Sequence, residues 1–351
     1  MRSVVYTRTG DPSVLSVVER DVSEPGPGEV RVRIVVSGVN PTDGKSRAGA
    51  TGQGLAFAEV VPNQDGSGVI DAIGDGVEGL AVGDRVWIYL AAYQRPTGTA
   101  QELTVVPASR VVLLPDNASF EIGASLGVPA LTAHRALTVH ENGPSRLGPG
   151  TLSGRTVLVA GGAGAVGHAA IQLARWSGAT VVTTISSPAK AALATAAGAH
   201  HTVDYTQPDP VGAIRAVAPD GIDMVVEVAP GVNAALNHAV LANHGSVAVY
   251  ANDGGDQMTL DVRAHFALNV RYQFLLLYTV GDEALAGGTE DVTAALRDGA
   301  LPVGEEAGLP LVRFPLEETA AAHAAVEDGL VGKVLIDVMT ASEAGTIPGV
   351  R

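Results

Sequence analysis

Residues 156–178, TVLVAGGAGAVGHAAIQLARWSG, form the stretch that most limits how this chain of 351 residues can fold. They begin with an unbroken apolar run over residues 156–160, which is typical of a strand buried on both faces of a parallel sheet. A glycine-rich turn over residues 161–167 follows, and then a helical pattern that ends at Gly178. Strand, glycine turn and helix in this order predict a turn that binds nucleotide phosphates.

Three glycines of this turn have separate predicted roles. Gly161 and Gly164 lack side chains, so the backbone can approach a pyrophosphate, and the N–H groups and positive dipole end of the next helix face the phosphates. Gly167 lets that helix pack tightly against the strand. The spacing is Gly-x-x-Gly-x-x-Gly rather than Gly-x-Gly-x-x-Gly, so a tight turn without a ligand stays open as the alternative.

Composition excludes several classes of protein. The chain has no cysteine, which rules out disulfides, thiolate zinc sites and cysteine nucleophiles, and its nine histidines form no metal-binding pattern. A formal net charge of −15 argues against nucleic acid or an anionic membrane as a partner. There is no apolar window of about 18 residues, and the first residues lack the apolar core of a secretory signal, so we expect a cytoplasmic protein.

The distribution of strands and helices predicts two domains. Up to about Gly127 the chain is rich in short apolar runs and glycines, which predicts a small, bent, β-barrel-like domain. From Thr156 strands and helices alternate, which predicts a doubly wound parallel sheet. The fold class is therefore α/β. We place the first domain at residues 1–127 and 274–351 and the dinucleotide-binding domain at residues 128–273.

Several further elements are predicted around these boundaries. Two separate helices are expected over residues 120–126 and 131–139. An apolar run predicts a strand over residues 272–277. Near the C-terminus, a helix over residues 316–328 leads into a strand over residues 334–338, which indicates a return of the chain to the first domain.

The end of the second alternating strand indicates which nucleotide binds. A fold of this kind that prefers NAD usually has an acidic residue here, which binds the ribose 2′-hydroxyl. This chain has Ser186 and Lys190 instead, and no carboxylate until Asp204. These side chains suit a 2′-phosphate, so we predict NADPH, with Tyr205 on the same rim. The alternative is a serine–proline pair that merely starts a helix, followed by a solvated lysine.

A polar loop after the strand at residues 29–36 supplies the candidate catalytic residues, Asn40 and Asp43. Asn40 precedes a proline, so its backbone is predicted to be extended. Its amide can donate hydrogen bonds to a substrate carbonyl or to the ribose beside the nicotinamide. The alternative is a turn that opens a helix with Thr42 or Asp43 as its cap, and Asp43 fits that structural role better.

The order of these segments resembles the medium-chain dehydrogenase/reductase superfamily and, within it, the zinc-free quinone oxidoreductases of the zeta-crystallin type. The resemblance covers about residues 1–339 and implies a GroES-like β-barrel domain and a Rossmann domain. It is carried by the motifs GVNPTD at 38–43, DGSGVIDAIG at 65–74, GDRVW at 83–87, GVPALTA at 127–133, GGAGAVG at 161–167 and GKVL at 332–335.

The resemblance also implies reduction without zinc. Zinc alcohol dehydrogenases of this superfamily have a cysteine where Asn40 stands and a Gly-His-Glu triplet where Asn63, Gln64 and Asp65 stand. They also have a four-cysteine structural zinc loop, which a chain without cysteine cannot form. With neither thiolate nor imidazole at these positions, nothing is expected to hold a catalytic zinc.

Position by position, the resemblance extends the predicted cofactor site. It also implies a dimer edge at residues 275–277, and it shows a departure near Thr51, where family members often have a tyrosine. The cofactor-binding residues predicted from the glycine turn and from the resemblance together are Thr132, Gly161, Ala163, Gly164, Ala165, Val166, Ser186, Lys190, Tyr205, Asn233, Tyr250, Ala251, Asn252, Leu275, Leu276, Leu277 and Lys333.

The predicted function is NADPH-dependent hydride transfer to a quinone in the cleft between the domains of a homodimer. A quinone needs little acid–base help, so we name no obligate general acid and give Asn40 an orienting role. One alternative is an enoyl or 2-alkenal reductase, which requires a proton donor that the sequence does not identify. Another is an NADPH-binding protein with a sensing or structural role.

Overall fold

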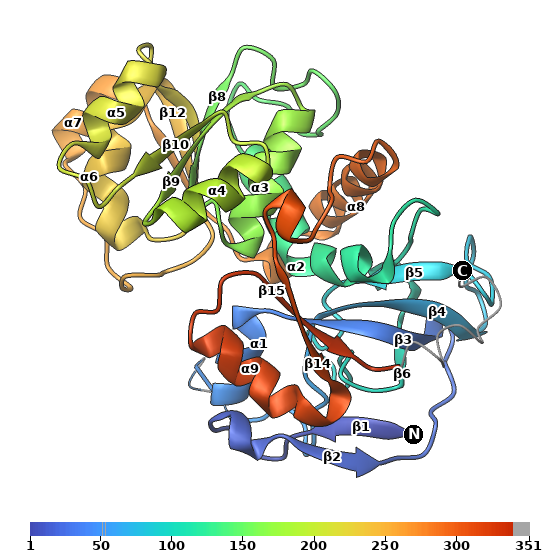
Figure 1. The fold of residues 1–351 in the computed structure, drawn as a ribbon. Coiled ribbons are helices and arrows are strands. Elements are labelled where there is room, and N and C mark those ends of the chain that lie inside the picture. The colour runs from blue at the N-terminus through green and yellow to red at the C-terminus, as the bar shows by residue number, and fades with distance from the viewer. Residues whose placement is uncertain (51, 53, 340–351) are drawn as a thin grey trace. The chain divides into compact units, whose positions relative to one another are not determined.

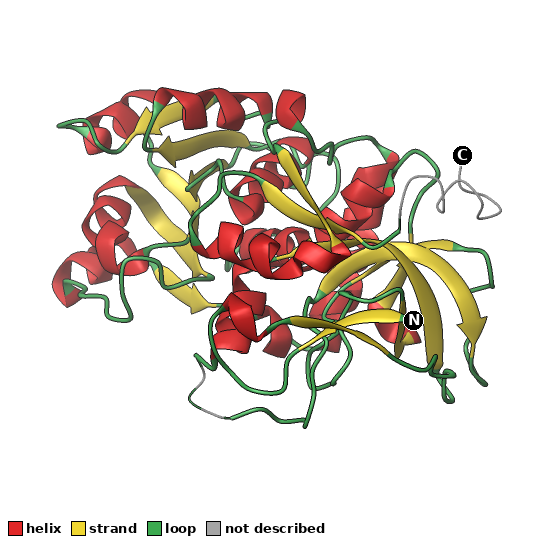
Figure 2. Cartoon of the chain, turned by 60° about the horizontal axis from the view of Figure 1, so that its bottom comes forward, coloured by secondary structure: helices red, strands yellow, loops and turns green. Residues whose placement is uncertain are grey.

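The computed structural model describes residues 1–50, 52 and 54–339. The chain folds into two compact units, which are coloured by position in Figure 1 and by secondary structure in Figure 2. The first comprises Met1–Val128 and the chain from Leu311 onward, and the second comprises Pro129–Pro310. One unit is rich in antiparallel strands and the other alternates parallel strands with helices, which confirms the predicted α/β class.

The first unit is built on a bent sheet around β3 (Glu29–Val39). This strand alternates fully buried aliphatic residues with partly exposed arginines, as predicted for a half-buried antiparallel strand. It pairs with β4 (Asp65–Ile73), and two register shifts in the pair bend the sheet. The strands approach closely at Gly68, where a Cβ would lie 1.9 Å from the carbonyl oxygen of Arg33.

The other described elements of this unit extend the sheet and cover it. Its helices are α1 (Pro41–Ala48) and α9 (Thr319–Glu327). Its further strands are β1 (Arg2–Val5), β2 (Ser16–Glu19), β5 (Arg85–Ile88), β6 (Leu103–Pro107), β7 (Val111–Leu113), β14 (Leu311–Pro315) and β15 (Lys333–Asp337). The sheet order is β14-β15-β3-β4-β5-β7, with β6 also paired to β3, while β1 and β2 pair separately.

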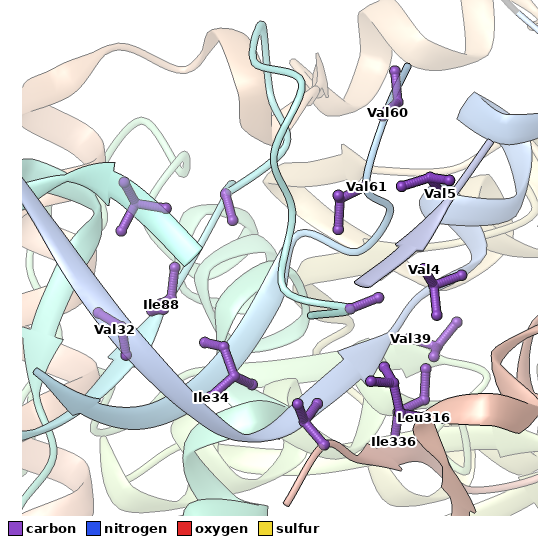
Figure 3. Close-up of a cluster of buried hydrophobic side chains, with 14 of the residues drawn as sticks. Val4, Val5, Val32, Ile34, Val39, Val60, Val61, Ile88, Leu316 and Ile336 are labelled. Atoms are coloured by element: carbon purple, nitrogen blue, oxygen red, sulfur yellow. The ribbon is translucent and has the colours of Figure 1, made fainter. Parts of the chain in front are cut away.

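The hydrophobic core of the first unit joins distant parts of the chain. Figure 3 shows Val4 and Val39 from the N-terminal strands close to Leu316 and Ile336. All four side chains are buried, and each contributes roughly 1.5–3 kcal/mol by leaving water. The C-terminal strand β15 therefore packs within the first unit, in accord with the predicted return of the chain.

The second unit contains a parallel sheet of the Rossmann type. Its described strands are β8 (Thr156–Ala160), β9 (Thr180–Ile185), β10 (His201–Asp204), β11 (Ile222–Glu227), β12 (Leu241–Val249) and β13 (Arg271–Phe274). They follow the order β10-β9-β8-β11-β12-β13, and all these neighbours pair in parallel, as predicted for a doubly wound sheet. The strand order reverses between β8 and β11, which is where such sheets bind their ligands.

A helix of the second unit follows each of these strands in the chain (Figures 1 and 2). These helices are α3 (Ala165–Trp176), α4 (Pro188–Ala196), α5 (Pro210–Val217), α6 (Pro230–Val240), α7 (Val262–Leu268) and α8 (Asp282–Arg297). None of the helices in the described part of the chain has both the length and the apolar composition needed to cross a membrane.

One continuous helix, α2 (Phe120–Leu137), replaces the two helices predicted over residues 120–126 and 131–139. Pro129 lies inside it. A proline there removes only one backbone N–H, and the neighbouring Leu126 and Ala130 are both buried. Packing of these apolar residues therefore outweighs the local cost of the proline.

The predicted second boundary at residue 274 is wrong, because residues 274–310 belong to the second unit. The predicted strand over residues 272–277 is also too long, since β13 ends at Phe274. On α8, the buried carboxylate of Asp291 forms hydrogen bonds with His134 Nε2 at 2.7 Å and with Arg146 Nε at 2.9 Å. Such an anchor between distant residues leaves no periodic signal in the sequence.

Candidate active site

The glycine turn lies between β8 and α3, at the carboxyl end of the parallel sheet. Gly161 has a φ of +70°, in the region that favours glycine. A Cβ at Gly167 would lie 2.4 Å from the carbonyl oxygen of Gly161, so the helix rests directly on the turn. Gly162 has a role that was not predicted from the sequence, because a Cβ at this position would lie 2.1 Å from Thr183 Oγ1.

The N-terminus of α3 has the features of an anion site. Gly164 is its N-cap and supplies no side-chain hydrogen bond, and the first turn contains no acidic residue. The leading N–H groups, from Ala165 and Val166 onward, therefore lack a side-chain acceptor at the cap. A Cβ at Gly164 would have only the Gly161 carbonyl within 4 Å, at 3.5 Å. This open, positively polarised helix end fits a pyrophosphate.

Two of the residues predicted to bind the 2′-phosphate lie together at the start of α4. The Lys190 ammonium donates a hydrogen bond to Ser186 Oγ at 3.1 Å. Ser187 caps the helix by accepting from the Lys190 N–H, so the helix-start alternative describes that serine correctly. Tyr205 is half exposed after β10, and its N–H bonds to the Ile185 carbonyl at 3.1 Å beside Ser186.

Asp204 is the first carboxylate near this rim, and it is engaged in its own turn. One carboxylate oxygen accepts from the Thr206 N–H at 2.9 Å and from Thr206 Oγ1 at 2.7 Å. These bonds lower the pKa of Asp204 below its usual value, with the hydroxyl as the main cause. The rim therefore offers an ammonium and hydroxyls, a donor set that suits a phosphate.

The carboxyl ends of β11 and β12 carry the next predicted residues. Asn233 donates from its amide nitrogen to Glu227 Oε1 at 2.9 Å, so one of its donors is committed inside the protein. The N–H of Tyr250 bonds to the Glu227 carbonyl at 3.1 Å, and burial raises the pKa of the Tyr250 phenol. Glu227 is fully buried and was not recognised in the sequence, because a single acid at a strand end has no distinctive pattern.

The remaining predicted residues of the second unit occupy varied environments. Thr132 is buried on α2, and Ala163 is buried in the glycine turn. Asn252 follows β12 together with Ala251, and its amide nitrogen donates to the Asp256 carboxylate. Residues 275–277 follow β13. Within them, the N–H of Leu275 bonds to the Val249 carbonyl at 2.7 Å, Leu276 is exposed and Leu277 is buried.

In the first unit, Asn40 lies at the centre of a buried polar cluster. Its backbone is extended, as predicted, with φ −125° and ψ 157°, and it is the N-cap residue of α1. Its amide nitrogen donates to Asp65 Oδ2 at 2.7 Å, and its amide oxygen accepts from Lys333 Nζ at 2.8 Å. Its backbone N–H donates to Asp43 Oδ2 at 2.7 Å. Within the part of the chain that the structure describes, Asp65 takes only one of the two amide N–H groups of Asn40.

Hydrogen bonds from the backbone complete this cluster. Asp43 also accepts from the Gln64 N–H at 3.1 Å, which agrees with the structural role anticipated for it. Asp65 accepts from the Val128 N–H at 2.9 Å. A Cβ at Gly127 would lie 2.0 Å from Asp65 Oδ1, so only glycine leaves room for that carboxylate. From the sequence, Asp65 was predicted only as the replacement for a zinc ligand, and its contact with Gly127 was not foreseen.

Burial controls the ionisation of the cluster. Removal from water raises the pKa of Asp43 to about 7, and the nearby Asp65 charge adds to this effect. Burial likewise raises the pKa of Asp65 to about 6, while the Lys333 ammonium opposes the shift. Burial lowers the pKa of Lys333, and both carboxylates oppose that change. Two carboxyls with raised pKa values and one amine with a lowered pKa therefore lie together in this buried cluster.

The predicted residues form separate groups in the two units. Asn40, Asp43 and Lys333 meet around Asp65, so Lys333 is placed against Asn40 and the Val39 carbonyl. In the second unit, the glycine turn, the Ser186–Lys190 pair and Asn233 all follow parallel strands of one sheet. Thr51, where the departure from the family was noted, lies outside the described residues.

A Rossmann-type sheet with an uncapped helix after a glycine turn, joined to a GroES-like unit, defines an oxidoreductase that uses a nicotinamide cofactor. The family models agree with this class. "Alcohol dehydrogenase GroES-like domain" matches residues 26–116, and "Zinc-binding dehydrogenase" matches residues 165–288. The chain belongs to the medium-chain dehydrogenase/reductase superfamily and is quinone-oxidoreductase-like, as the sequence predicted.

Among curated relatives, the chain is 28% identical to a quinone oxidoreductase of Rattus norvegicus over 345 residues, with 96% of this chain and 97% of the relative covered. It is 34% identical to the synaptic vesicle membrane protein VAT-1 homolog of Rattus norvegicus over 252 residues. That match covers 71% of this chain and 59% of the relative's length.

Solved structures extend the similarity over nearly the whole chain. A structure described as an NAD-dependent alcohol dehydrogenase is 30% identical with a TM-score of 0.82, covering 97% of this chain and 100% of the other. A mycobacterial quinone oxidoreductase is 28% identical with a TM-score of 0.81, covering 96% and 99%, and it has also been solved with NADPH. A 2-haloacrylate reductase is 25% identical with a TM-score of 0.78, covering 97% and 100%.

The zinc that the family description implies does not fit the residues around Asn40. Both ends of the Asn40 amide and the Asp65 carboxylate already hold hydrogen bonds. Lys333 Nζ lies 3.9 Å from Asp65 Oδ2, and an ammonium here repels a divalent cation. An amide, one carboxylate and an amine also lack the thiolates and imidazoles that zinc prefers.

Proposed function

We propose that this protein is an NADPH-dependent, zinc-independent quinone oxidoreductase. The observation that carries the cofactor choice is the Lys190–Ser186 hydrogen bond of 3.1 Å at the end of β9, where a preference for NAD would call for a free carboxylate. The acceptor class is carried over from the quinone oxidoreductases that resemble the chain over almost their full length. A cytoplasmic location remains a prediction of the sequence.

The roles of the residues follow from their chemistry. The N-terminus of α3 and the glycine turn hold the pyrophosphate, and Lys190 with Ser186 holds the 2′-phosphate. When bound, NADPH supplies a hydride to the acceptor. Asn40 presents its remaining amide N–H to an acceptor oxygen, because Asp65 and Lys333 hold the two ends of the amide in one orientation. Catalysis then depends mainly on proximity and on exclusion of water.

Zinc independence is part of the proposal, and it is supported by the donor set around Asn40. A fixed ammonium occupies this cluster in place of a metal ion. Reduction of a quinone requires one hydride and one proton, and no Lewis acid is needed for a carbonyl that already accepts electrons readily. A chelator should therefore leave the activity unchanged.

Reduction of an activated carbon–carbon double bond is the second candidate. It is favoured by the buried carboxyls of Asp43 and Asp65, because their raised pKa values of about 7 and about 6 let them hold the proton that this reaction needs and that the sequence alone did not identify. Similarity to a 2-haloacrylate reductase is consistent with it. The proton would pass to the carbon or oxygen that becomes negative after hydride addition.

We also propose a homodimer formed through the edge of the second unit. In the described sheet, β13 is an edge strand with neighbours on one side only. Exposed apolar side chains lie on α7, at the end of β13 and two residues beyond that strand, namely Val262, Phe266, Phe274 and Leu276. A second copy would cover this surface symmetrically.

The dimer can be tested by sedimentation of Phe274→Arg beside Val82→Arg, which changes an exposed valine of the first unit. We expect the Phe274 variant to sediment as a monomer and the Val82 variant to remain a dimer. A monomeric wild-type protein, or a dimeric Phe274 variant, would contradict the proposed surface.

The activity is tested by following NADPH oxidation with metal-free protein, in the presence and absence of a chelator. One panel contains 1,4-benzoquinone and 9,10-phenanthrenequinone, and the other contains enones. Turnover of quinones alone supports the quinone reductase, and formation of saturated products from enones supports the second candidate. Tight NADPH binding without turnover in either panel would contradict both and favour a sensing or structural role.

A further inference from the structure

Glu227 is a buried carboxylate that carries no ion pair in the described part of the chain, and the hydrogen bonds that it accepts there all come from N–H donors. Oε1 accepts from the Ala229 N–H at 2.6 Å and from Asn233 Nδ2 at 2.9 Å. Oε2 accepts from Asn237 Nδ2 at 2.5 Å. An ionised carboxylate only accepts hydrogen bonds, so three N–H donors on two oxygens match its ionised form.

Glu227 also occupies a particular position in the parallel sheet of the second unit. It ends β11, and Val226 pairs with Val159 of β8, so Glu227 stands level with Ala160, the last residue before the glycine turn. On the other side it pairs with Val249 of β12. The carboxylate therefore lies where the strand order reverses, beside the crevice in which such sheets bind dinucleotides.

The orientation of the cofactor follows from the proposed function. Lys190 and Ser186 hold the adenosine half at the end of β9, on one side of the glycine turn. The pyrophosphate spans the turn, so the nicotinamide half extends over the opposite side, where β11 and β12 end. Glu227 is thus a buried negative charge on the nicotinamide side of the crevice.

We propose that Glu227 stabilises the positive charge that the nicotinamide ring acquires when it releases its hydride. The reduced ring is neutral and the oxidised ring is a cation, so a fixed carboxylate nearby favours the oxidised form and the approach to it. Asn233, Asn237 and the Ala229 N–H hold the carboxylate in place, so no reorganisation is needed when the charge develops.

The charge of Glu227 already acts on its surroundings. Burial, with the Glu227 carboxylate as the second cause, raises the pKa of the Tyr272 phenol to about 12. Burial is also the main cause of the raised pKa of the Tyr250 phenol, and the carboxylates of Asp253 and then Glu227 add to it. The influence of Glu227 therefore extends beyond the residues to which it is hydrogen bonded, as a charge in a medium of low polarity should.

The plain alternative is that Glu227 only anchors the start of α6. The two interpretations differ in how they treat the two states of the cofactor. An anchor supports NADP⁺ and NADPH equally, whereas a charge discriminates between them. The ratio of the two dissociation constants therefore separates the interpretations without requiring turnover.

The test is Glu227→Gln, with the dissociation constants of NADP⁺ and NADPH measured by titration calorimetry. A flip of the Asn237 amide lets glutamine keep three hydrogen bonds, so the change removes mainly the charge. We expect NADP⁺ binding to weaken about tenfold relative to NADPH. The swap E227Q/N237D, which returns a carboxylate to the same pair, should restore the wild-type ratio.

A second route to the same result guards against misfolding of the glutamine variant. E227M/N237L replaces both buried polar partners by apolar side chains of similar size and also removes the charge. It should shift the ratio in the same direction. An unchanged ratio in a folded variant of either kind overturns the proposal. If the protein uses NADH instead, the same ratio measured with NAD⁺ and NADH still decides the question, so failure of the NADPH proposal is distinguishable.

Discussion

Lys333 donates a 2.8 Å hydrogen bond to the amide oxygen of Asn40, although the two residues are 293 positions apart in the sequence. The bond places an ammonium beside the residue that the sequence identified as the candidate catalytic amide. With Asp65 on the amide nitrogen, it also determines which end of the Asn40 side chain is the donor. These two bonds hold the Asn40 amide in one orientation, and the charge balance of the cluster is open to direct tests.

The coupling between Lys333 and Asp65 should be visible in protein stability. Lys333→Met leaves two buried carboxyls without their cation, so we expect a loss of roughly 3–5 kcal/mol in the free energy of unfolding. Asp65→Asn should also be destabilising. The double variant should lose less stability than the sum of the two single losses, by more than about 1 kcal/mol. Removing one charge of the pair also removes the penalty of leaving the other charge unpaired. Urea unfolding measures all three.

A surface pair provides the control for that cycle. Arg313 and Asp337 form an exposed ion pair, so Arg313→Met should cost less than about 1 kcal/mol. Strict additivity of the Lys333 and Asp65 changes would show that the cluster does not function as a unit.

The raised pKa of Asp43 predicts a dependence of stability on pH. In the unfolded chain an aspartate titrates near pH 3.8, whereas burial raises the pKa of Asp43 to about 7 in the folded protein. The stability that the Asp43 carboxyl contributes is fully present below pH 3.8 and is lost as the pH rises through about 7. Between these two pH values only the folded state holds the proton, so raising the pH favours unfolding. Each pH unit in this window costs roughly 1.4 kcal/mol.

Asp43→Asn removes this titration, so the stability gap between wild type and variant should narrow as the pH rises from about 4 to about 7. Urea unfolding of both proteins at the two ends of the window measures the gap. A gap that stays constant or widens would mean that Asp43 is ionised in the folded protein throughout.

The glycine turn contains a matched pair of positions with opposite predicted effects. Gly167→Ala places a methyl 2.4 Å from the Gly161 carbonyl, so we expect a loss of about 1–3 kcal/mol in stability from overpacking. Gly164→Ala meets nothing closer than 3.5 Å and has an ordinary φ of −84°. Its stability should change by less than about 1 kcal/mol, while NADPH binding weakens at least tenfold because the methyl fills the approach to the phosphate.

Thermal unfolding and NADPH titration of both variants test this contrast. If Gly164→Ala binds NADPH as tightly as the wild type, the open side of the helix N-terminus is not the phosphate site.

The NADPH preference rests on Lys190 and is tested by Lys190→Ala. Loss of one charge-assisted hydrogen bond should weaken NADPH binding about tenfold or more, with no change for NADH, which has no 2′-phosphate. The matched control is Arg263→Ala, which removes an exposed cation from α7 without touching this rim. Equal affinity of the wild type for NADH and NADPH, or an unaltered Lys190 variant, would rule the preference out.

Much of the fold could be predicted because it depends on local pattern. The run at residues 156–160 and the glycines after it specified β8, the turn and α3 almost residue by residue. The extended backbone of Asn40 followed from the proline behind it. Where the forces were not local, prediction failed. Pro129 did not break α2, and residues 274–310 joined the second unit through contacts such as Asp291 with His134.

The same distinction between local pattern and long-range contact applies to the residues of the candidate site. The residues proposed to bind the cofactor through backbone or through near neighbours, such as Gly161, Ser186 and Lys190, could be predicted from the sequence because they depend on short-range spacing. Asp65 and Glu227 could not be, because nothing in the residues around them distinguishes a buried acid from an exposed one. Their roles arise from burial and from partners elsewhere in the fold.

The sequence by itself determined the superfamily, the α/β class, the glycine turn between β8 and α3, and the absence of zinc-binding thiolates, since each depends on residue type and short-range order. Only the tertiary structure decided which charges are buried together. Lys333 reaches Asn40 because β15 pairs with β3. The Asp65 carboxylate lies against Gly127, and Glu227 lies where the strand order of the parallel sheet reverses. Ionisation and electrostatic strength depend on the distance and dielectric around each group, and both are properties of the folded chain.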